Sequence, residues 1–227
     1  MVMMRVMNKE IKLVILMLVV ALAGMMILAG CSDDDDPVTV VPELDPPTAP
    51  ETADELITQF QAAYQAMNLD NYVALLDPEF LMILQEDTID HFPEMGTTLD
   101  FTEEERIHQR MFSGESVTDP QGVFVPAMRT IGFLVCNALD GWSAADDQGR
   151  FPGTEWAPFR VEILFDRGQE YSTLILDGVV KIYVRTHEEI VDGKETTHCL
   201  MAGMVDFTGT GKPVEPAPWG SVKAFYR

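Results

Sequence analysis

The side chains best suited to acid/base chemistry in this sequence are its four histidines, since imidazole changes charge near neutral pH. His108 follows Glu104 by four residues, a spacing that puts both on one face of a helix and usually gives modest helix support. His91 follows Asp90, and a neighbouring carboxylate can orient an imidazole as a base. We treat His91 and His108 as weak pocket candidates, place His187 at a solvated strand end, and predict no catalytic centre built on histidine.

Other common catalytic patterns are missing from the sequence. It contains no His-Glu-x-x-His motif for a metal, no Gly-x-Ser-x-Gly elbow for a nucleophilic serine, and no glycine-rich phosphate loop. We therefore predict no metal site and no cofactor. Trp142, Trp156 and Trp219 are interpreted as packing anchors rather than as ligand-stacking side chains.

Cys31 is the residue for which the sequence predicts the most specific chemistry. It follows a positively charged start (residues 5–12) and an uncharged apolar stretch (13–27), a pattern typical of a secretory signal and too short for a transmembrane helix of about 20 apolar residues. The string Leu-Ala-Gly-Cys at 28–31 resembles the lipobox of bacterial lipoproteins. That resemblance implies a signal peptide over 1–30, a diacylglyceryl thioether on Cys31, and acylation of the new N-terminus by a fatty acid such as palmitate. The alternatives are a plain signal peptide and an uncleaved anchor.

The rest of the chain is strongly acidic. Without residues 1–30 it carries 12 Lys and Arg against 36 Asp and Glu, a formal charge of −24. Such a charge excludes nucleic acid as a partner, because phosphates need a basic surface. Residues 31–51, with five prolines, seven acids and no Lys or Arg, are expected to form an extended tether. Ser32 resembles the outer-membrane sorting position of enteric lipoproteins, so we expect a lipid-anchored envelope protein at the outer rather than the inner membrane.

Cys136 and Cys199 remain for the folded part of the chain. Both lie in apolar, strand-like runs, and nothing in the sequence aligns those two runs as neighbours. Since free cysteine often serves as a small core residue, we predict two free thiols.

The elements that must position these residues begin with helices. Thr52-Ala-Asp-Glu is a capping box, followed by apolar residues at helical spacing to Met67. A short second helix, capped by Asp70, is expected to end at Asp77-Pro78. A second capping box, Thr102-Glu-Glu-Glu, predicts a third helix to about Gly114.

Strand patterns fill the remainder. Apolar or alternating runs predict strands over the following ranges: 80–84, 129–137, 160–165, 171–176, 179–186, 197–207 and 221–226. Asp177-Gly178 and Asp192-Gly193 are both typical of tight hairpin turns. Helices first and strands after predict one α+β domain over 52–227.

This order of elements resembles the NTF2-like fold shared with SnoaL-like cyclases and ketosteroid isomerases. The resemblance rests on the helix 56–67, the stretch 68–80 (Asn-Leu-Asp-Asn-Tyr-Val-Ala-Leu-Leu-Asp-Pro-Glu-Phe), the helix 103–111 and the long strands. It implies a cone, with N-terminal helices packed on a curved antiparallel sheet around a pocket where enzymes of the fold place Asp, Glu or His. No Asp/Tyr pair falls at the matching isomerase positions, and 138–157 is an insertion.

The function expected from these observations is that of a membrane-tethered envelope lipoprotein whose non-catalytic domain binds a small apolar ligand or a protein partner. The first alternative is a SnoaL-like enzyme using general acid/base catalysis in the cone. The second is a structural component of the envelope.

Overall fold

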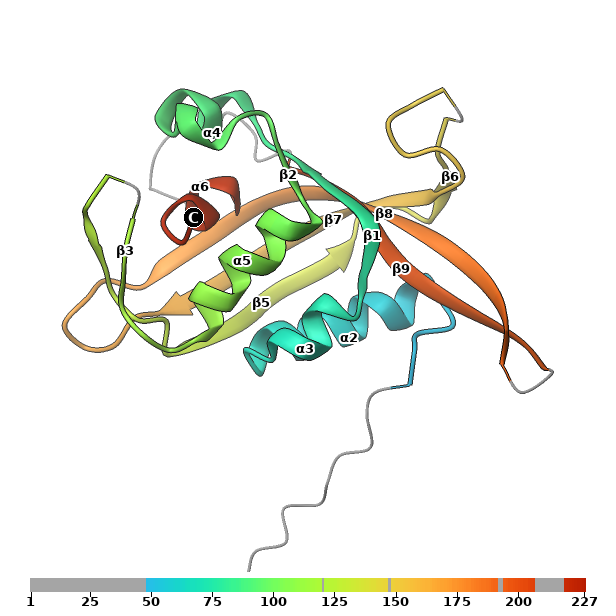
Figure 1. The fold of residues 1–227 in the computed structure, drawn as a ribbon, viewed down its shortest axis with the longest axis horizontal. Coiled ribbons are helices and arrows are strands. Elements are labelled where there is room, and N and C mark those ends of the chain that lie inside the picture. The colour runs from blue at the N-terminus through green and yellow to red at the C-terminus, as the bar shows by residue number, and fades with distance from the viewer. Residues whose placement is uncertain (1–47, 120, 147, 192–193, 207–218) are drawn as a thin grey trace, which may run out of the picture. The chain divides into compact units, whose positions relative to one another are not determined.

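The computed structural model of the chain describes residues 48–119, 121–146, 148–191, 194–206 and 219–227 (Figure 1). The expected signal peptide, Cys31 and most of the expected tether lie outside the described residues. The described elements are α2 (Ala53–Gln65), α3 (Leu69–Val73), β1 (Leu76–Ile83), α4 (Glu86–His91), the 3-10 helix η1 (Pro93–Met95), β2 (Thr98–Asp100), α5 (Phe101–Phe112), β3 (Val117–Thr118), β4 (Phe124–Val125), β5 (Thr130–Ala138), β6 (Ser143–Ala144), β7 (Glu155–Asp166), β8 (Leu174–Val191), β9 (Lys194–Asp206) and α6 (Trp219–Ala224). Within the described part of the chain, no helix is both long and apolar enough to cross a membrane.

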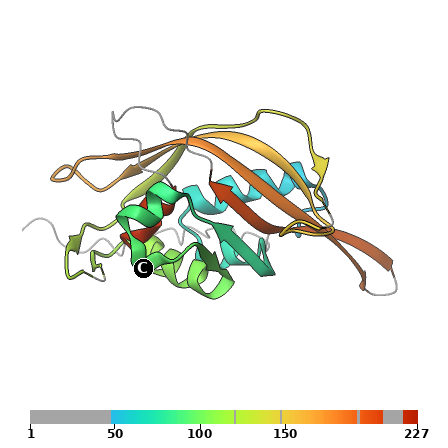
Figure 2. The same ribbon diagram turned by 90° about the horizontal axis from the view of Figure 1, so that it is seen from above.

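The fold class predicted from the sequence is confirmed, because helices pack on one face of a large curved sheet (Figures 1 and 2). The strand order is β2-β1-β9-β8-β7-β5, with β6 paired to β7, and β3 and β4 form a separate ribbon. The sheet is mostly antiparallel, but β1 runs parallel to β9, so the expectation of a wholly antiparallel sheet is corrected at this one pair.

The first helices follow from local signals. Thr52 caps α2 by accepting a hydrogen bond from the backbone N–H of Glu55 at 3.2 Å, as the capping box predicts. Asn68, not Asp70, caps α3, and Asp100, not Thr102, caps α5. In both cases the cap is an Asn or Asp two residues upstream of the predicted one, and its side-chain oxygen accepts a hydrogen bond from the backbone N–H three residues ahead.

The core lies between these helices and the inner face of the sheet. Val180, Ile182 and Val184 of β8 are buried there, while Lys181 and Tyr183 are partly exposed on the outer face, which confirms the predicted alternation.

Asp177-Gly178 does not form the predicted hairpin turn, because β8 continues through it and pairs with β7 on either side. The Asp177 carboxylate forms an ion pair with Arg160 of β7, and Arg160 also donates to the Gly178 carbonyl at 3.2 Å. The backbone ladder with β7 holds the dipeptide in an extended strand, and these side-chain contacts add to it. At the second Asp-Gly pair the turn residues lie outside the described residues, and the flanking Val191 and Lys194 are paired antiparallel.

The predicted last strand is also corrected, since residues 219–224 form the helix α6. Its polar residues Ser221 and Lys223 are two positions apart, a spacing that fits a strand, and all six of its residues are buried. Gly220 permits close packing on α4, because a Cβ there would lie 2.8 Å from a methyl carbon of Thr88.

The folded unit also begins before Thr52. The backbone N–H of Cys199 donates to the Pro50 carbonyl at 2.7 Å, and the Gln59 amide donates to the Thr48 carbonyl at 2.9 Å. The end of the predicted tether is therefore attached to α2 and β9.

Candidate functional site

Five polar side chains from four helices meet in the interior of the domain. We call them the buried polar cluster: Tyr64 of α2, Tyr72 of α3, Glu104 and His108 of α5, and Lys223 of α6. Each has a relative exposure of 1% or less. Buried ionisable groups held together in this way are a common property of functional sites, although structural networks share it.

His108 is held by both ring nitrogens. Its Nδ1 lies 2.8 Å from the Glu104 backbone carbonyl, an acceptor, so this nitrogen carries the proton. Its Nε2 lies 2.6 Å from the Tyr64 hydroxyl, which donates to it. Burial lowers the pKa of His108 from its ordinary value of 6.5 to about 4, with Glu104 opposing that shift. The imidazole is therefore neutral at pH 7.

Glu104 and Lys223 form an ion pair without exposure to solvent. The Lys223 ammonium donates to Glu104 Oε1, and the Tyr72 hydroxyl donates to the same oxygen at 2.5 Å. Burial opposes ionisation of Glu104, but the positive charge of Lys223 and the hydrogen bonds from Lys223 and Tyr72 lower its pKa overall. Burial lowers the pKa of Lys223, and the Glu104 charge opposes this. The pair is neutral in sum, which is the condition under which two charges can be buried together.

One oxygen of the cluster is unsatisfied. Glu104 Oε2 is buried and accepts no hydrogen bond from the described residues. A buried carboxylate oxygen without a donor is costly and therefore uncommon.

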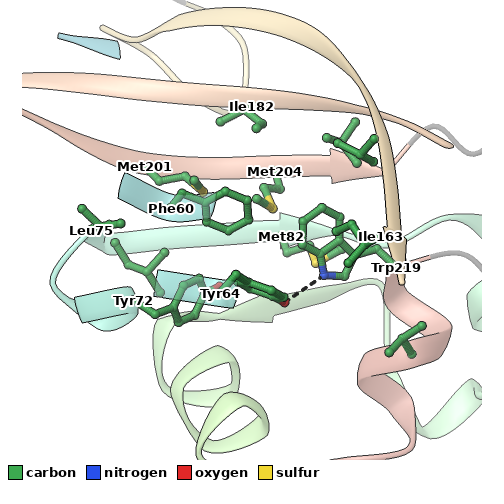
Figure 3. Close-up of a cluster of buried hydrophobic side chains, with 14 of the residues drawn as sticks. Phe60, Tyr64, Tyr72, Leu75, Met82, Ile163, Ile182, Met201, Met204 and Trp219 are labelled. Carbon is green, nitrogen blue, oxygen red and sulfur yellow. Dashed lines mark hydrogen bonds between the residues drawn. The ribbon is translucent and has the colours of Figure 1, made fainter. Parts of the chain in front are cut away.

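Aromatic side chains enclose the cluster. The indole N–H of Trp219 donates to the Tyr64 hydroxyl at 3.2 Å, and Figure 3 shows both rings beside Phe60. The ring of Tyr72 lies 4.2 Å from that of His108, centroid to centroid, and Phe112 packs edge-on to Tyr64. Burial raises the pKa of Tyr64 and of Tyr72 well above 10, and the Glu104 charge adds to both shifts.

Two local features place these polar groups inside. Helix α5 buries Ile107 and Met111 on one face, and Glu104 and His108 lie on the same buried stripe, one turn apart. Helix α6 brings Lys223 beneath Trp219, with the ammonium 5.5 Å from the indole centroid and 3.1 Å from the sulfur of Met82.

The hydrogen-bonding groups of the cluster donate to and accept from one another and are closed off from solvent. The hydrogen bonds run from Trp219 through Tyr64 to His108, and separately from Tyr72 and Lys223 to Glu104. At neutral pH the imidazole of His108 is uncharged, and the two tyrosines keep their protons. General acid/base catalysis instead needs a group with a pKa near the working pH that reaches the substrate.

His108, a weak pocket candidate in the sequence, is fully buried inside the domain. His91 is exposed at the end of α4 and does not join the cluster. His187 lies on β8, stacked on His198 of β9 at 5.2 Å and paired with Asp77 at 2.9 Å. In the part of the chain that the structure describes, no group of three or more His, Cys, Asp or Glu side chains is arranged to hold a metal ion.

Both remaining cysteines are free, as predicted. Cys136 is on β5 and Cys199 on β9, with β7 and β8 between them. At about 4.8 Å per strand spacing the two residues are too far apart for a disulfide.

Sequence reasoning missed Lys223 and the polar role of the two tyrosines. Tyr64 and Tyr72 lie in the two helices predicted first along the chain, and both are buried. The one available signal for Lys223 was a lysine in an otherwise apolar C-terminal run, where burial of the charge requires an acidic partner.

Three surface hollows lie away from the cluster. One is at the free end of the β8–β9 hairpin and includes Ile190, another is beside the start of α2 and includes Trp142, and a third is on the outer face of the sheet and includes Trp156 and Tyr183. None of these three is lined by a member of the buried polar cluster.

No protein-family model matches the chain, and no curated protein matches it. Several solved structures are similar in fold. AusH from Aspergillus nidulans is 11% identical, with 72% of this chain and 89% of that chain covered and a TM-score of 0.37. A proposed polyketide cyclase from Pseudomonas putida is 13% identical, with 70% of this chain and 92% of that chain covered and a TM-score of 0.33. An NTF2-like protein of unknown function from Shewanella oneidensis is 10% identical, with 67% of this chain and 93% of that chain covered and a TM-score of 0.32. The fold class is that of helices on a curved sheet, and it rests on the arrangement of this chain's own elements.

Proposed function

We propose that this chain is a lipid-anchored envelope protein whose NTF2-like domain is a non-catalytic binding module with a closed interior. The observation that supports a non-catalytic role most directly is the enclosure of the buried polar cluster. The groups that could act as acid or base there are bonded to one another and have exposures of 1% or less. Ligands of such a module would bind at its outer surface.

Anchoring through Cys31 is supported by the lipobox-like string and the charged, then apolar, segment before it. The test is mass spectrometry of the mature N-terminus. We expect a lipid-modified Cys31 as first residue, and Cys31→Ser should leave the protein unprocessed or released from the membrane. An unmodified N-terminus elsewhere would refute the anchor. Fractionation tests the outer-membrane assignment, which recovery of the protein with the inner membrane would refute.

The closed interior is tested by tyrosine nitration of the folded protein followed by peptide mass spectrometry. Tyr171 is 42% exposed and serves as the internal control, while Tyr64 and Tyr72 are 0% and 1% exposed. We expect nitration of Tyr171 and protection of the other two until the protein is unfolded. Nitration of Tyr64 and Tyr72 in the native state would show that the interior opens and would refute the proposal.

The alternative of a general acid/base enzyme is favoured by one observation. Glu104 Oε2 lacks a donor in the closed interior, and a substrate hydroxyl or amide entering an opened interior could supply it. This alternative requires α6 to leave, because α6 carries Lys223 and Trp219. Native nitration of Tyr64 would therefore favour the enzyme.

A further inference from the structure

Strands β8 and β9 continue beyond the rest of the sheet as a two-stranded ribbon, which carries a pair of histidines (Figures 1 and 2). The pairing of β7 with β8 reaches only as far as Val184, and the pairing of β1 with β9 starts at Met201. Just beyond these points His187 of β8 and His198 of β9 are directly opposite each other in the register. Side chains of such cross-strand neighbours lie on one face and interact.

The two imidazole rings are separated by the distance that a shared metal ion requires. Their centroids lie 5.2 Å apart, with planes at 13°. With metal–nitrogen bonds of about 2.0–2.1 Å and tetrahedral angles, two imidazoles on one zinc ion have ring centres roughly 5 Å apart. Binding the same ion therefore requires the rings to turn about their Cβ–Cγ bonds, a torsion with a broad energy profile, and does not require the strands to move.

A buried carboxylate orients the ring of His187. Asp77 of β1 is 1% exposed, and its Oδ2 lies 2.9 Å from His187 Nε2. Because a carboxylate only accepts, Nε2 carries the proton of the neutral ring and Nδ1 keeps the lone pair that can bind a metal. Histidines that bind metals usually donate their other ring nitrogen to a carboxylate or carbonyl, which fixes the ring and makes it a better ligand. His187 has this support in the structure.

His198 is the more adjustable of the two residues. Its Nδ1 lies 3.8 Å from Glu189 Oε1, which is beyond hydrogen-bond distance, and its ring makes no hydrogen bond to the described residues. The side chain of His198 is 21% exposed and that of His187 is 35% exposed, so water reaches both. The ring of His198 can therefore turn toward His187 without breaking a hydrogen bond, and water can complete the coordination of an ion.

The charges around the two histidines favour a cation. The carboxylates of Asp77 and Glu189 lie beside the rings. Arg185 is also near, but its guanidinium is paired with Asp77 at 2.9 Å and with Glu79 at 3.1 Å. Since no three His, Cys, Asp or Glu side chains of the described residues are arranged around one ion, the protein would supply two ligands and water the others.

We propose that His187 and His198 bind a zinc ion across the ribbon, with His187 ligating through Nδ1 and water completing a tetrahedral shell. Imidazole nitrogen is a ligand that zinc prefers, and tetrahedral geometry is the one that zinc usually adopts in proteins. The ion would link β8 to β9 beyond the end of the main sheet. This inference goes beyond the proposed function, since it concerns neither the membrane anchor nor the closed interior.

The test is calorimetric titration of the full chain, freed of metal by a chelator and held in nonionic detergent, with zinc chloride. We expect saturable 1:1 binding that depends on the two histidines. His198→Asn should weaken this binding at least about 10-fold, because changes to a supporting residue alone cost about 10–100-fold and this variant loses a ligand. His91→Asn, a matched change at an exposed histidine of α4, should leave it unchanged. Any zinc held by the acidic run 33–36 would be the same in both variants.

Thermal unfolding gives a second readout. An ion bound only by the folded state stabilises it, so zinc should raise the Tm of the native protein and of His91→Asn but not that of His198→Asn. Far-UV circular dichroism without zinc shows that both variants are folded. Absence of saturable binding, or equal zinc affinity in His198→Asn and His91→Asn, would overturn the proposal. Nitration of Tyr64 and Tyr72 reports separately on the closed interior, so such a result would leave the proposed function standing.

Discussion

Replacing Lys223 by methionine tests the reasoning about the buried polar cluster most directly. The substitution keeps the length and apolar character of the side chain and removes only the ammonium. It leaves the Glu104 carboxylate fully buried with one remaining donor, the Tyr72 hydroxyl at 2.5 Å. Breaking a buried pair in this way typically costs about 3–5 kcal/mol, because the surviving charge is uncompensated. We expect a loss of that size in the free energy of unfolding at pH 7.

The loss should depend on pH with a defined sign. Without Lys223, burial raises the pKa of Glu104 above its unfolded value, so the folded state binds a proton that the unfolded state lacks. Stability attached to such a group is present at low pH and lost as pH rises. The destabilisation of Lys223→Met should therefore shrink as pH falls from 7 to 5, by up to about 1.4 kcal/mol per pH unit.

Glu104→Gln completes the cycle, since it keeps an acceptor for Tyr72 and removes the charge. The double variant contains no buried ion, so we expect it to be more stable than the sum of the single losses by about 2–3 kcal/mol. Urea unfolding of the full chain in nonionic detergent, followed by far-UV circular dichroism at pH 7, 6 and 5, gives all four free energies. Additive single effects, within about 0.5 kcal/mol, would refute the ion pair.

Three further outcomes follow from other parts of the structure. Folding lowers the pKa of His108 from 6.5 to about 4, so between these pH values the unfolded state binds a proton that the folded state does not. Between pH 7 and 4.5 the free energy of unfolding should therefore fall by up to about 3 kcal/mol more in the native protein than in His108→Gln. Equal pH dependence of the urea unfolding curves of the two proteins would contradict this. Gly203→Ala should destabilise the folded domain by about 1–3 kcal/mol, because the new Cβ clashes with Phe151, and this is measured as a fall in Tm. Gly132→Ala is the control and should cost much less, because no atom lies within 4 Å of its new Cβ. Burial raises the pKa of Cys136 to about 11, and Cys199 is buried as well, so both should react slowly with a thiol reagent in the native state. After unfolding without reductant both should be labelled. If neither is labelled then, the two cysteines form a disulfide.

The helices of the N-terminal half and most strands could be predicted because local signals agree with tertiary packing there. Thr52 caps α2, and the apolar spacing of Leu56, Phe60 and Tyr64 matches the face that is buried. In β8 the alternation of Val180, Ile182 and Val184 with polar residues reports directly on the two faces of a sheet.

Prediction failed where a contact distant in sequence decided the conformation. Asp177-Gly178 is typical of a turn, but its pairing with Glu162 and Val161 of β7 keeps it in a strand. The two polar residues of 219–224, Ser221 and Lys223, are spaced as in a strand, so the spacing of polar and apolar residues did not indicate a helix. The burial of His108 could not be predicted for a related reason. Its hydrogen-bond partner Tyr64 lies 44 positions away in the chain.

Helix α6 links the stability of the domain to the enclosure of its interior. It contributes Lys223 to the ion pair and Trp219 to the Tyr64 hydroxyl, and it also buries Val222. Burial of each large apolar side chain is worth about 1.5–3 kcal/mol, so detaching α6 costs several kcal/mol even before the charges are separated. A cost of about 4 kcal/mol leaves roughly one molecule in a thousand open. An enzyme acting at the cluster would work with that small fraction, whereas a ligand at the outer surface would meet every folded molecule. This difference in accessibility is the physical reason why the proposed function places ligand binding at the outer surface.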